Sequence, residues 1–366
     1  MAKQGPSFTV MSWNVYHGGD IDPILQVGFQ DLPLLASRAS RAWNEVLAND
    51  FRDRAVALVD GIQDTMPDLV GLQEVARFRT LALDSGAEGP LLVDSLDFRP
   101  ILQRELGSRY LPYSFIGEVE NTKARVPVEG SWEDDRFVPT RLVELTLRDA
   151  VLVRDGLPVE EVSQGNYRAH VLLGSDPLGG EIRMERGWVG VDAWVGSLPV
   201  RIVNTHLEIQ RHAEIQVQQA EELLEEIVSG SDGVTVLLGD FNSDAAASPG
   251  DRSWTPTYAR ITEAGFGDAW PALRGDSDPG GLTCCHGSDL RDLTTTLDQR
   301  IDFIFFRGPG KTAEGGWKLR PTGVKLVGRG QGTETSPGGR WPSDHAGLLA
   351  TFSSSRPSRP PAGPPP

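Results

Sequence analysis

Residues 342–352 read PSDHAGLLATF, and this stretch guides our interpretation of the whole chain. Its aspartate–histidine pair, Asp344 and His345, stands directly before a short apolar run that is typical of a buried strand. A carboxylate beside an imidazole places a metal ligand or hydrogen-bond acceptor next to a proton-transfer or phosphate-binding group. Because such a dipeptide is common, its meaning depends on whether other strands end in similar residues.

Two other apolar runs end in the same kind of residue. Residues 234–242, VTVLLGDFN, predict a buried strand that delivers Asp240 and Asn242 through a tight glycine turn. Residues 67–74, PDLVGLQE, predict a short strand buried on both faces, with Glu74 emerging at its end. An isolated Glu at such a place is usually a solvated loop residue, so the repetition of the pattern carries the argument.

Three further polar residues occupy comparable places. Asn14 lies near the end of the run FTVMSWNV, His206 ends the run VRIVNTH, and Asp302 sits in the run RIDFIFF. A carboxylate among apolar neighbours is costly unless it is paired or hydrogen-bonded, so Asp302 should have a specific partner. An Asn at a strand end often only caps a turn, and that alternative stays open for Asn14 at this point.

Arg148 lies where two apolar stretches meet, the alternating residues 143–147 and the run at 150–153. The residues alone leave two interpretations open. One is a surface arginine that pairs with a nearby carboxylate, and the other is a residue with a functional role.

Helical spacing of apolar residues is clear in three places. Residues 36–46 and 55–66 predict two helices, or one bent helix, ending before the next proline. Residues 213–227 predict an amphipathic helix with an acidic, solvated outer face. We also predict a helix around residues 91–106 and a polar excursion over the surface at residues 121–139.

The composition is that of a folded protein with one large domain or two ordinary ones. The 366 residues are 39% hydrophobic and 23% charged, which is enough apolar content for a sizeable core. The formal net charge of -16 argues against a broad basic surface that grips nucleic acid nonspecifically. We predict a folded domain over residues 1–352 and a disordered tail, rich in Ser, Arg and Pro, over residues 353–366.

Cys284 and Cys285 are the two cysteines of the chain. They exclude a disulfide framework and a multi-cysteine zinc site, and they favour a buried pair of thiols. The N-terminus shows no leader pattern, and no apolar run is long enough to span a bilayer. We therefore expect a cytoplasmic protein without a transmembrane segment, although a secreted protein supplied without its leader would look the same.

Together, the polar residues at the strand ends supply several oxygen ligands and two imidazoles. The set contains no thiolate, so it suits a hard cation such as Mg²⁺ or Mn²⁺ better than zinc. Mg²⁺ typically takes one or two protein carboxylates and keeps waters that a phosphate can displace. The histidines and spare carboxylates then remain for proton transfer and for orienting the imidazoles, which fits metal-assisted attack of water on a phosphoester.

Six short motifs follow one another along the chain: SWN (12–14), LQE (72–74), NTHLE (204–208), GDFN (239–242), RID (300–302) and SDH (343–345). This series resembles the endonuclease/exonuclease/phosphatase superfamily, with motifs of the sphingomyelinase and deoxyribonuclease type, from about residue 8 to residue 352. The resemblance implies the DNase-I-like fold of class α/β (α+β). That fold is a four-layer α/β/β/α sandwich of two mixed β-sheets flanked by helices, with the site at one edge. Hydrophobic periodicity alone predicts only a mixed α/β protein.

The resemblance also implies roles for the metal-binding residues. Glu74 matches the principal metal ligand, and Asn14 and Asp344 match residues close to the metal or its waters. Asp240 matches the residue that aligns or deprotonates the attacking water. The implied cofactor is Mg²⁺, with Mn²⁺ as the alternative.

The remaining matches concern the substrate phosphate. His345 would hydrogen-bond the scissile phosphate and be oriented by Asp302, while Asn242 would contact the phosphate or the water. His206 resembles the second histidine of the deoxyribonuclease and sphingomyelinase branches, which is a general acid or a phosphate ligand. Arg148 is similar to a phosphate-binding arginine of some members. Fixed donors placed where negative charge grows each lower the barrier by roughly a few kcal/mol.

Two departures from the family leave the substrate open. Val75 and Ala76 follow Glu74, where abasic-site enzymes usually continue with a lysine. A serine follows Asn242, where inositol phosphatases carry a longer signature with an arginine. We therefore expect a metal-dependent phosphoester hydrolase, foremost a phosphodiesterase. Its substrate is a small molecule, a lipid-linked phosphodiester or a nucleic acid, and we expect it to act as a monomer.

Two alternatives to this function stay open. The first is a DNA or RNA endonuclease of the same superfamily, and the second is a catalytically silent binding or scaffold protein. All six motifs keep their polar residues, which favours an enzyme. The acidic charge favours a smaller phosphoester over duplex DNA.

Overall fold

The structure is a computed structural model of the 366-residue chain. It describes residues 3–27, 29–83, 89–228, 234–275, 279–292, 297–308, 317–330 and 334–356.

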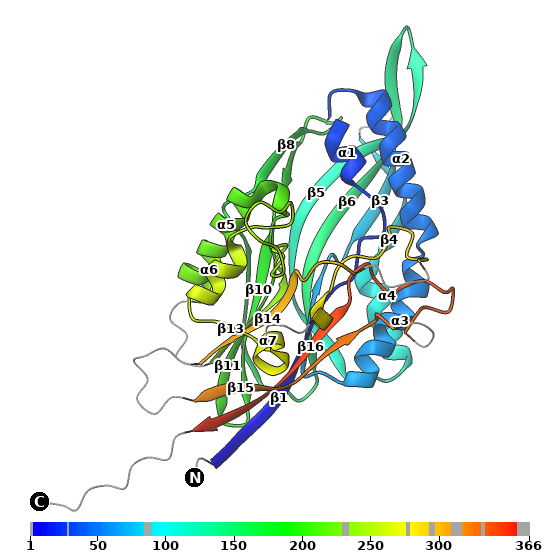
Figure 1. Ribbon diagram of the computed structural model, residues 1–366. Coiled ribbons are helices and arrows are strands. Elements are labelled where there is room, and N and C mark those ends of the chain that lie inside the picture. The colour runs from blue at the N-terminus through cyan, green and yellow to red at the C-terminus, as the bar shows by residue number, and fades with distance from the viewer. Residues whose placement is uncertain are drawn as a thin grey trace, which may run out of the picture.

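Two mixed β-sheets form the centre of the molecule (Figure 1). Eight strands of the described chain make the first sheet, in the order β15-β16-β1-β2-β6-β3-β4 with β5 also paired to β6. Their bounds are β1 (Lys3–Asn14), β2 (Leu69–Gln73), β3 (Arg77–Ala82), β4 (Leu91–Asp97), β5 (Tyr113–Glu133), β6 (Arg136–Arg154), β15 (Lys318–Val327) and β16 (Gly347–Arg356).

The second sheet has the order β13-β14-β12-β11-β10-β7 among the described residues. Its strands are β7 (Val159–Asn166), β10 (Gly187–Val195), β11 (Leu198–His206), β12 (Val234–Asp240), β13 (Gly267–Asp268) and β14 (Asp302–Arg307). A separate two-stranded sheet joins β8 (Val171–Ser175) to β9 (Glu181–Met184). The apolar run that ends at His206 forms β11, which pairs antiparallel with β10 across a tight turn.

Helices cover the outer face of each sheet, and Figure 1 shows the two groups on opposite sides of the strands. The helices on the first sheet are α1 (Asp22–Val27), α2 (Leu32–Ala48), α3 (Phe51–Thr65) and α4 (Phe98–Ser108). Those on the second are α5 (Ala213–Glu222), a π-helical turn (Leu223–Ile227) and α6 (Thr257–Glu263), while α7 (Ala269–Arg274) lies near β14 and β15. The expected four-layer α/β/β/α sandwich is therefore confirmed.

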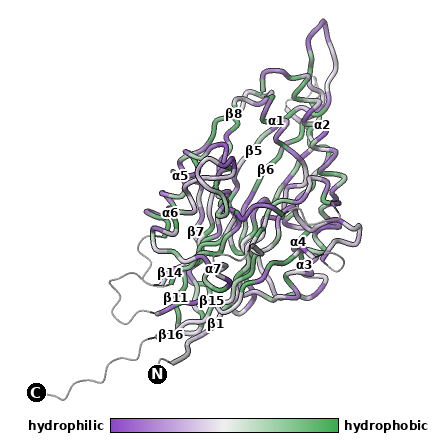
Figure 2. Tube along the Cα trace, in the orientation of Figure 1, coloured by the Kyte–Doolittle hydropathy of each residue, from purple (hydrophilic) through white to green (hydrophobic). Residues whose placement is uncertain are grey.

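Three apolar clusters hold these layers together. The inner cluster lies between the sheets and includes Val10 and Val151 of the first sheet and Ile202 and Val236 of the second. Gly71 allows the sheets to approach closely, because a Cβ there would lie 2.1 Å from Leu238 Cδ1 of the opposite sheet. The outer clusters pack α2, α3 and α4 on the first sheet and α5 and α6 on the second. Figure 2 accordingly shows mostly hydrophobic strands through the middle and more hydrophilic residues along α5.

The two helices predicted before Pro67 are confirmed as α2 and α3. Asp31 caps α2, and its side chain accepts a hydrogen bond from the backbone nitrogen of Leu34. Met66 ends α3 in the left-handed conformation directly before the proline. The amphipathic helix predicted for residues 213–227 is also confirmed, as α5 and the π-helical turn.

Two expectations from the sequence were wrong. The helix predicted around residues 91–106 begins only at Phe98, because residues 91–97 form β4 at the edge of the first sheet. The polar excursion predicted at residues 121–139 is instead a long β5–β6 hairpin, which extends beyond the body of the molecule in Figure 1. Its charged residues pair across the strands, as Arg125 does with Glu144, so polarity there does not indicate a loop.

The ends of the described chain modify the predicted domain boundary. β16 continues to Arg356, so four residues that the sequence assigned to the tail are part of a strand. Residues 357–366 lie outside the described residues. No helix in the part of the chain that the structure describes is long and apolar enough to cross a membrane.

Candidate active site

The first sheet brings three of the predicted residues to one end. β1 runs parallel to β2 and antiparallel to β16. Asn14 is the last residue of β1, Glu74 directly follows β2, and Asp344 lies shortly before β16. Because the end of β1 and the start of β16 meet, all three residues reach the same edge of the sheet.

The second sheet repeats this arrangement. β12 runs parallel to β11 and antiparallel to β14. His206 and Asp240 end their strands and are register partners, and Asp240 is also the register partner of Asp302 at the start of β14. Gly239 is required at this point, because a Cβ would lie 1.9 Å from the carbonyl oxygen of Thr205.

The side chains from the two sheets meet at Asn14. Its amide nitrogen donates to Glu74 Oε1 at 3.2 Å and to Asp240 Oδ2 at 3.1 Å. Its amide oxygen accepts a hydrogen bond from the backbone nitrogen of Tyr16 at 3.0 Å. Asn14 therefore links the predicted metal ligand on one sheet to the predicted base on the other.

His345 and Asp302 form a buried pair. His345 Nδ1 lies 2.8 Å from Asp302 Oδ2, and His345 Nε2 lies 3.9 Å from Asp240 Oδ2. Burial alone would lower the pKa of His345, but the charges of Asp302 and Asp344 outweigh it and raise this pKa well above the ordinary value. The imidazole is therefore protonated at neutral pH, with Nε2–H directed toward the side of Asp240.

Asp240 and Asn242 stand beside His206. Asp240 Oδ2 lies 3.5 Å from His206 Nε2, and Asn242 Nδ2 lies 3.1 Å from the same nitrogen. Burial and the nearby charge of Asp302 raise the pKa of Asp240 to about 7. Burial and the charge of Arg186 hold the pKa of His206 well below the ordinary value, so this imidazole is neutral. A neutral His206 favours the role of phosphate ligand over that of general acid.

Arg148 does not reach this site, which corrects its assignment as a phosphate ligand. Its buried guanidinium forms an ion pair with Asp97, lies 3.5 Å from Glu118, and donates to the carbonyl oxygens of Val75 and Ala76. The structure bears out the pairing of the alternative interpretation, but not its surface position, because Arg148 is buried.

Arg186, in contrast, brings a guanidinium into the lining of the site. Its guanidinium lies 3.0 Å from His206 Nε2 and 3.4 Å from Glu208 Oε1, and all three residues are buried. Sequence reasoning missed Arg186 because it stands between β9 and β10 with no apolar run or motif around it.

Asp149 and His17 are two further residues that sequence reasoning missed. Asp149 accepts from Asn121 Nδ2 at 2.7 Å and lies 3.9 Å from His206 Nδ1. Consecutive residues on a strand point to opposite faces of the sheet. Arg148 points away from the site, so its neighbour Asp149 points toward it, and this alternation is the signal that could have identified Asp149. His17 pairs through Nδ1 and its backbone nitrogen with Glu74 Oε2, and it lies only three residues after Asn14.

Several other motif residues hold the site together rather than face it. Trp13 Nε1 donates to the carbonyl oxygen of His345, and Ser343 Oγ donates to the carbonyl oxygen of Asn14. Gln73 Nε2 donates to Asn204 Oδ1 at 2.6 Å across the two sheets. These bonds explain why the motifs contain polar residues that carry no chemistry of their own.

Glu74, Asp344 and Asn14 fit a hard divalent cation in the chemistry of their donors. Burial raises the pKa of Asp344 to about 6, and the charge of Glu74 adds to this effect. Burial would also raise the pKa of Glu74, but the charge and hydrogen bond of His17 hold it well below the ordinary value. Two half-buried carboxylates that repel each other are oxygen ligands of the kind that Mg²⁺ or Mn²⁺ takes. Asn14 turns its amide nitrogen toward Glu74, so its direct ligation of a metal stays a prediction.

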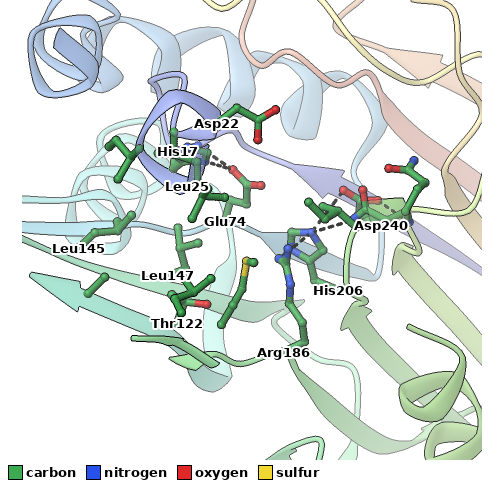
Figure 3. Close-up of a pocket in the computed structure, with 18 of the residues that line it drawn as sticks. His17, Asp22, Leu25, Glu74, Thr122, Leu145, Leu147, Arg186, His206 and Asp240 are labelled. Carbon is green, nitrogen blue, oxygen red and sulfur yellow. Dashed lines mark hydrogen bonds and ion pairs between the residues drawn. The ribbon is translucent and has the colours of Figure 1, made fainter. Parts of the chain in front are cut away.

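A cavity of about 310 Å³ opens beside these residues and is lined by Glu74, His206, Asp240, Asn242 and His345. Figure 3 shows Glu74 near its middle, with His206 and Asp240 on one side. His17 and Arg186 line it as well, so one part of the cavity is polar, whereas Asn14, Asp149, Asp302 and Asp344 are not among its lining residues.

Cys284 and Cys285 also line this cavity. The structure joins them in a disulfide, where the sequence predicted a pair of thiols. The backbone of Cys284 bridges to Gln299 and His345, so this segment also helps to fix the histidine.

A family model described as the Endonuclease/Exonuclease/phosphatase family matches residues 11–345. A comparison with curated proteins gave no significant match.

Solved structures resemble this chain across nearly its whole length. Humanized TDP2 from D. rerio is 18% identical with a TM-score of 0.52, covering 94% of this chain and 98% of that one. The mannosyl-6-phosphatase Bt3783 from Bacteroides thetaiotaomicron is 15% identical with a TM-score of 0.51, covering 94% and 99%. An endonuclease/exonuclease/phosphatase from Beutenbergia cavernae is 18% identical with a TM-score of 0.50, covering 95% and 71%. At these identities the likeness shows the fold.

Proposed function

Because this chain belongs to the endonuclease/exonuclease/phosphatase family, we propose that it is a divalent-metal-dependent phosphodiesterase. The observation that carries the proposal is the arrangement around Asp240. Its buried carboxylate lies 3.5 Å from His206 Nε2 and 3.9 Å from His345 Nε2, and Asn14 connects it to Glu74. The proposed base, the imidazole of His345 and Glu74, one of the predicted metal ligands, thus line one cavity.

Asp240 is the group that takes the proton of the attacking water. A raised pKa near 7 suits a general base that works at neutral pH. His345 is protonated and donates through Nε2 to an oxygen of the phosphate, where negative charge grows in the transition state. Asp302 fixes the orientation of that imidazole through its bond to Nδ1.

His206, Asn242 and Arg186 bind the phosphate from the other side. The neutral imidazole and the amide offer hydrogen bonds, and Arg186 offers the positive charge. Glu74 and Asp344, with Asn14 beside them, would hold Mg²⁺ or Mn²⁺, which supplies polarisation of a phosphate oxygen when bound.

A nucleic acid is the alternative substrate, and a D. rerio TDP2 of the same fold has been described in complex with a single-strand DNA product. The formal net charge of -16 works against a polyanion here. Of the described residues that line the cavity, Arg186 is the only lysine or arginine.

The test is a hydrolysis panel with Mg²⁺ or Mn²⁺. It includes bis-p-nitrophenyl phosphate, p-nitrophenyl phosphate, plasmid DNA and an abasic oligonucleotide. We expect diester hydrolysis that is lost in Asp240→Asn and kept in Asp251→Asn, a matched change in an exposed turn. Hydrolysis confined to the monoester, or unchanged in Asp240→Asn, would refute the proposal. A DNA activity that falls steeply with added salt would establish the nucleic acid alternative.

A further inference from the structure

His17 and Glu74 come together where two parallel strands end. His17 lies in the loop after β1, and Glu74 directly follows β2, which runs parallel to β1. The backbone nitrogen of His17 donates to Glu74 Oε2 at 2.9 Å, and its ring Nδ1 contacts the same oxygen. Figure 3 marks this pair with dashed lines. Because an ionised carboxylate only accepts hydrogen bonds, Nδ1 carries the proton of the second bond.

The backbone around this pair is in a conformation that side chains rarely adopt. Tyr16 has a φ of 55° and Glu74 a φ of 61°, both in the left-handed region. Such a residue costs roughly 1–3 kcal/mol and persists only when its surroundings impose it. The backbone nitrogen of Tyr16 donates to Asn14 Oδ1, and its carbonyl oxygen accepts from Arg54. The strained turn at Tyr16 thus directs His17 toward Glu74.

The loop that carries His17 is fixed independently of Glu74. Asn49 Nδ2 donates to the carbonyl oxygen of Gly18 at 2.8 Å. Gly19 packs directly on α2, because a Cβ there would lie 2.6 Å from a carbonyl oxygen of that helix. A fixed donor therefore meets a carboxylate on a rotatable side chain, so His17 orients Glu74 rather than the reverse.

The bonds of His17 determine which oxygen of Glu74 remains for a cation. A carboxylate offers about four acceptor positions, about two on each oxygen. His17 fills the positions of Oε2, and Asn14 Nδ2 takes a position of Oε1 at 3.2 Å. What is left is a single position on Oε1, so Glu74 binds a cation in a monodentate way.

Monodentate binding favours Mg²⁺ over Ca²⁺. Mg²⁺ demands near-ideal octahedral geometry and keeps several of its waters, whereas Ca²⁺ takes more oxygen ligands and accepts both oxygens of one carboxylate. A carboxylate that offers one oxygen therefore costs Ca²⁺ a ligand and costs Mg²⁺ none.

We propose that His17 is a positioning residue that restricts Glu74 to monodentate binding of the cation and thereby favours Mg²⁺ over Ca²⁺. This inference rests on the proposed function, in which Glu74 is a metal ligand. His17 acts through Glu74 and is not a ligand itself. Its Nδ1 is occupied by Glu74, and its Nε2 is buried without a hydrogen-bond partner among the described residues.

The test is isothermal titration calorimetry of Mg²⁺ and of Ca²⁺ into metal-stripped full-length protein, which needs no turnover. In His17→Ala we expect the Mg²⁺ affinity to fall about tenfold, as is usual when a partner behind a metal ligand is removed. The Ca²⁺ affinity should stay within about threefold of wild type, because Glu74 can then offer both oxygens. A general loosening of the site would weaken both cations alike.

Two amide variants separate the bond to Glu74 from the bulk of the side chain. The side-chain nitrogen of Asn takes the place of histidine Nδ1, whereas that of Gln lies farther out, at the place of Nε2. His17→Asn should therefore keep the Mg²⁺ affinity within about threefold of wild type, and His17→Gln should lower it about as much as His17→Ala. Comparing the two amides decides the question even if His17→Ala does not fold.

The control is His170→Ala, which changes a histidine that is not among the residues lining the cavity and should alter neither affinity. Unchanged affinities in His17→Gln, equal losses for the two cations, or weaker Mg²⁺ binding in His17→Asn than in His17→Gln would overturn the inference. The proposed function survives each of these results if Glu74→Gln weakens Mg²⁺ binding in the same titration. If Glu74→Gln binds Mg²⁺ as wild type does, the metal site of the proposed function fails, and the inference falls with it.

Discussion

His345 shows how neighbouring charges decide the protonation of a proposed catalytic side chain. Its imidazole is buried, which disfavours the proton, yet Asp302 at 2.8 Å and the charge of Asp344 keep it protonated. His206 is equally buried but faces Arg186, and the same burial leaves it neutral. The two histidines near Asp240 therefore differ in charge, because His345 is protonated and His206 is neutral.

Removing the charge of Asp302 should change His345 in a measurable way. In Asp302→Asn we expect the pKa of His345 to fall toward the ordinary value and kcat to drop by roughly 10²-fold, because the cation opposite the phosphate is lost. An NMR titration of the histidine ring measures the pKa. A variant with unchanged titration and near wild-type kcat would show that Asp302 has no part in positioning or charging the imidazole.

Asp149 makes stability depend on pH. Burial raises its pKa from 3.8 to about 7, so the folded protein keeps a proton that the unfolded chain releases above about pH 4. This contribution is fully present below the unfolded pKa and is lost as the pH rises through about 7. We therefore compare the free energy of unfolding of the wild type with that of Asp149→Asn. The wild-type value should fall relative to the variant value by on the order of a few kcal/mol as the pH rises from 4 to 7.

Urea unfolding of both proteins in EDTA at several pH values measures this difference. The side chain at position 149 does not titrate in the Asn variant. The pH-dependent contributions of the other groups are the same in both proteins as long as their pKa values are unaffected, so these contributions cancel in the difference. A difference that stays flat from pH 4 to pH 8 would argue against a raised pKa of Asp149.

At the residue scale, the structure brings together most of the residues that the sequence proposed for the site, and the sequence missed some of the residues beside them. Glu74, Asp240 and His345 stand in short motifs at strand ends, so type and position together pointed to them. Arg186 and Asp149 carry no such signal, because Arg186 lies between two strands without a motif around it and the surroundings of Asp149 depend on which face of β6 it occupies. Arg148 was misplaced for the same reason.

At the scale of elements, Arg54 joins three segments that surround the site. Its buried guanidinium on α3 donates to the carbonyl oxygens of Val15, Tyr16, Asn49 and Pro342 at 2.8 to 3.2 Å. The first two carbonyls belong to the loop after β1, and the last precedes Ser343 in the loop that carries Asp344. The helix thereby holds the two loops that present Asn14 and Asp344.

Arg54→Met should lower the free energy of unfolding by about 3 kcal/mol or more, because several buried carbonyl oxygens lose their donor. Differential scanning calorimetry measures the loss, and Arg52→Met, an exposed change on the same helix, serves as control. Equal melting temperatures for the two variants would mean that the guanidinium bonds do not stabilise the fold.

The end of β16 tests where the domain stops. Ser354 is buried and donates to the carbonyl oxygen of Pro6, and Ser353 accepts from Arg320. Deleting residues 353–366 should therefore lower Tm by at least about 3 °C, whereas deleting only residues 357–366 should leave Tm and activity unchanged. A large loss in the shorter deletion would show that residues 357–366 belong to the folded domain.

The elements that the sequence predicted well are those with a single dominant periodicity. α2, α3, β2 and β12 have clear apolar patterns, and all four were expected. The β5–β6 hairpin was missed because its charged residues form cross-strand ion pairs such as Arg141 with Glu129, which compensate for the missing apolar alternation. Local polarity was therefore a poor guide to a long, partly exposed hairpin.

At the scale of the whole molecule, the site exists only because two sheets pack face to face. Asn14 and Glu74 come from one sheet and Asp240 and His206 from the other, and the sheets meet where Gly71 removes a side chain. The four-layer architecture followed from the order of six motifs, whereas periodicity alone indicated only a mixed α/β protein. Which residues meet across the sheets depends on tertiary packing and became visible only in the structure.

The central claim is that this cavity uses a divalent metal to direct water onto the phosphorus of a diester. The most direct test is hydrolysis of bis-p-nitrophenyl phosphate in ¹⁸O-labelled water by metal-stripped protein, before and after Mg²⁺ is restored, with Glu74→Gln alongside. We predict no turnover without metal, turnover with one ¹⁸O in the p-nitrophenyl phosphate when Mg²⁺ is present, and a loss of at least about tenfold in Mg²⁺ affinity in the variant. Hydrolysis that persists in EDTA, or label found in p-nitrophenol instead of the phosphate, would contradict the account.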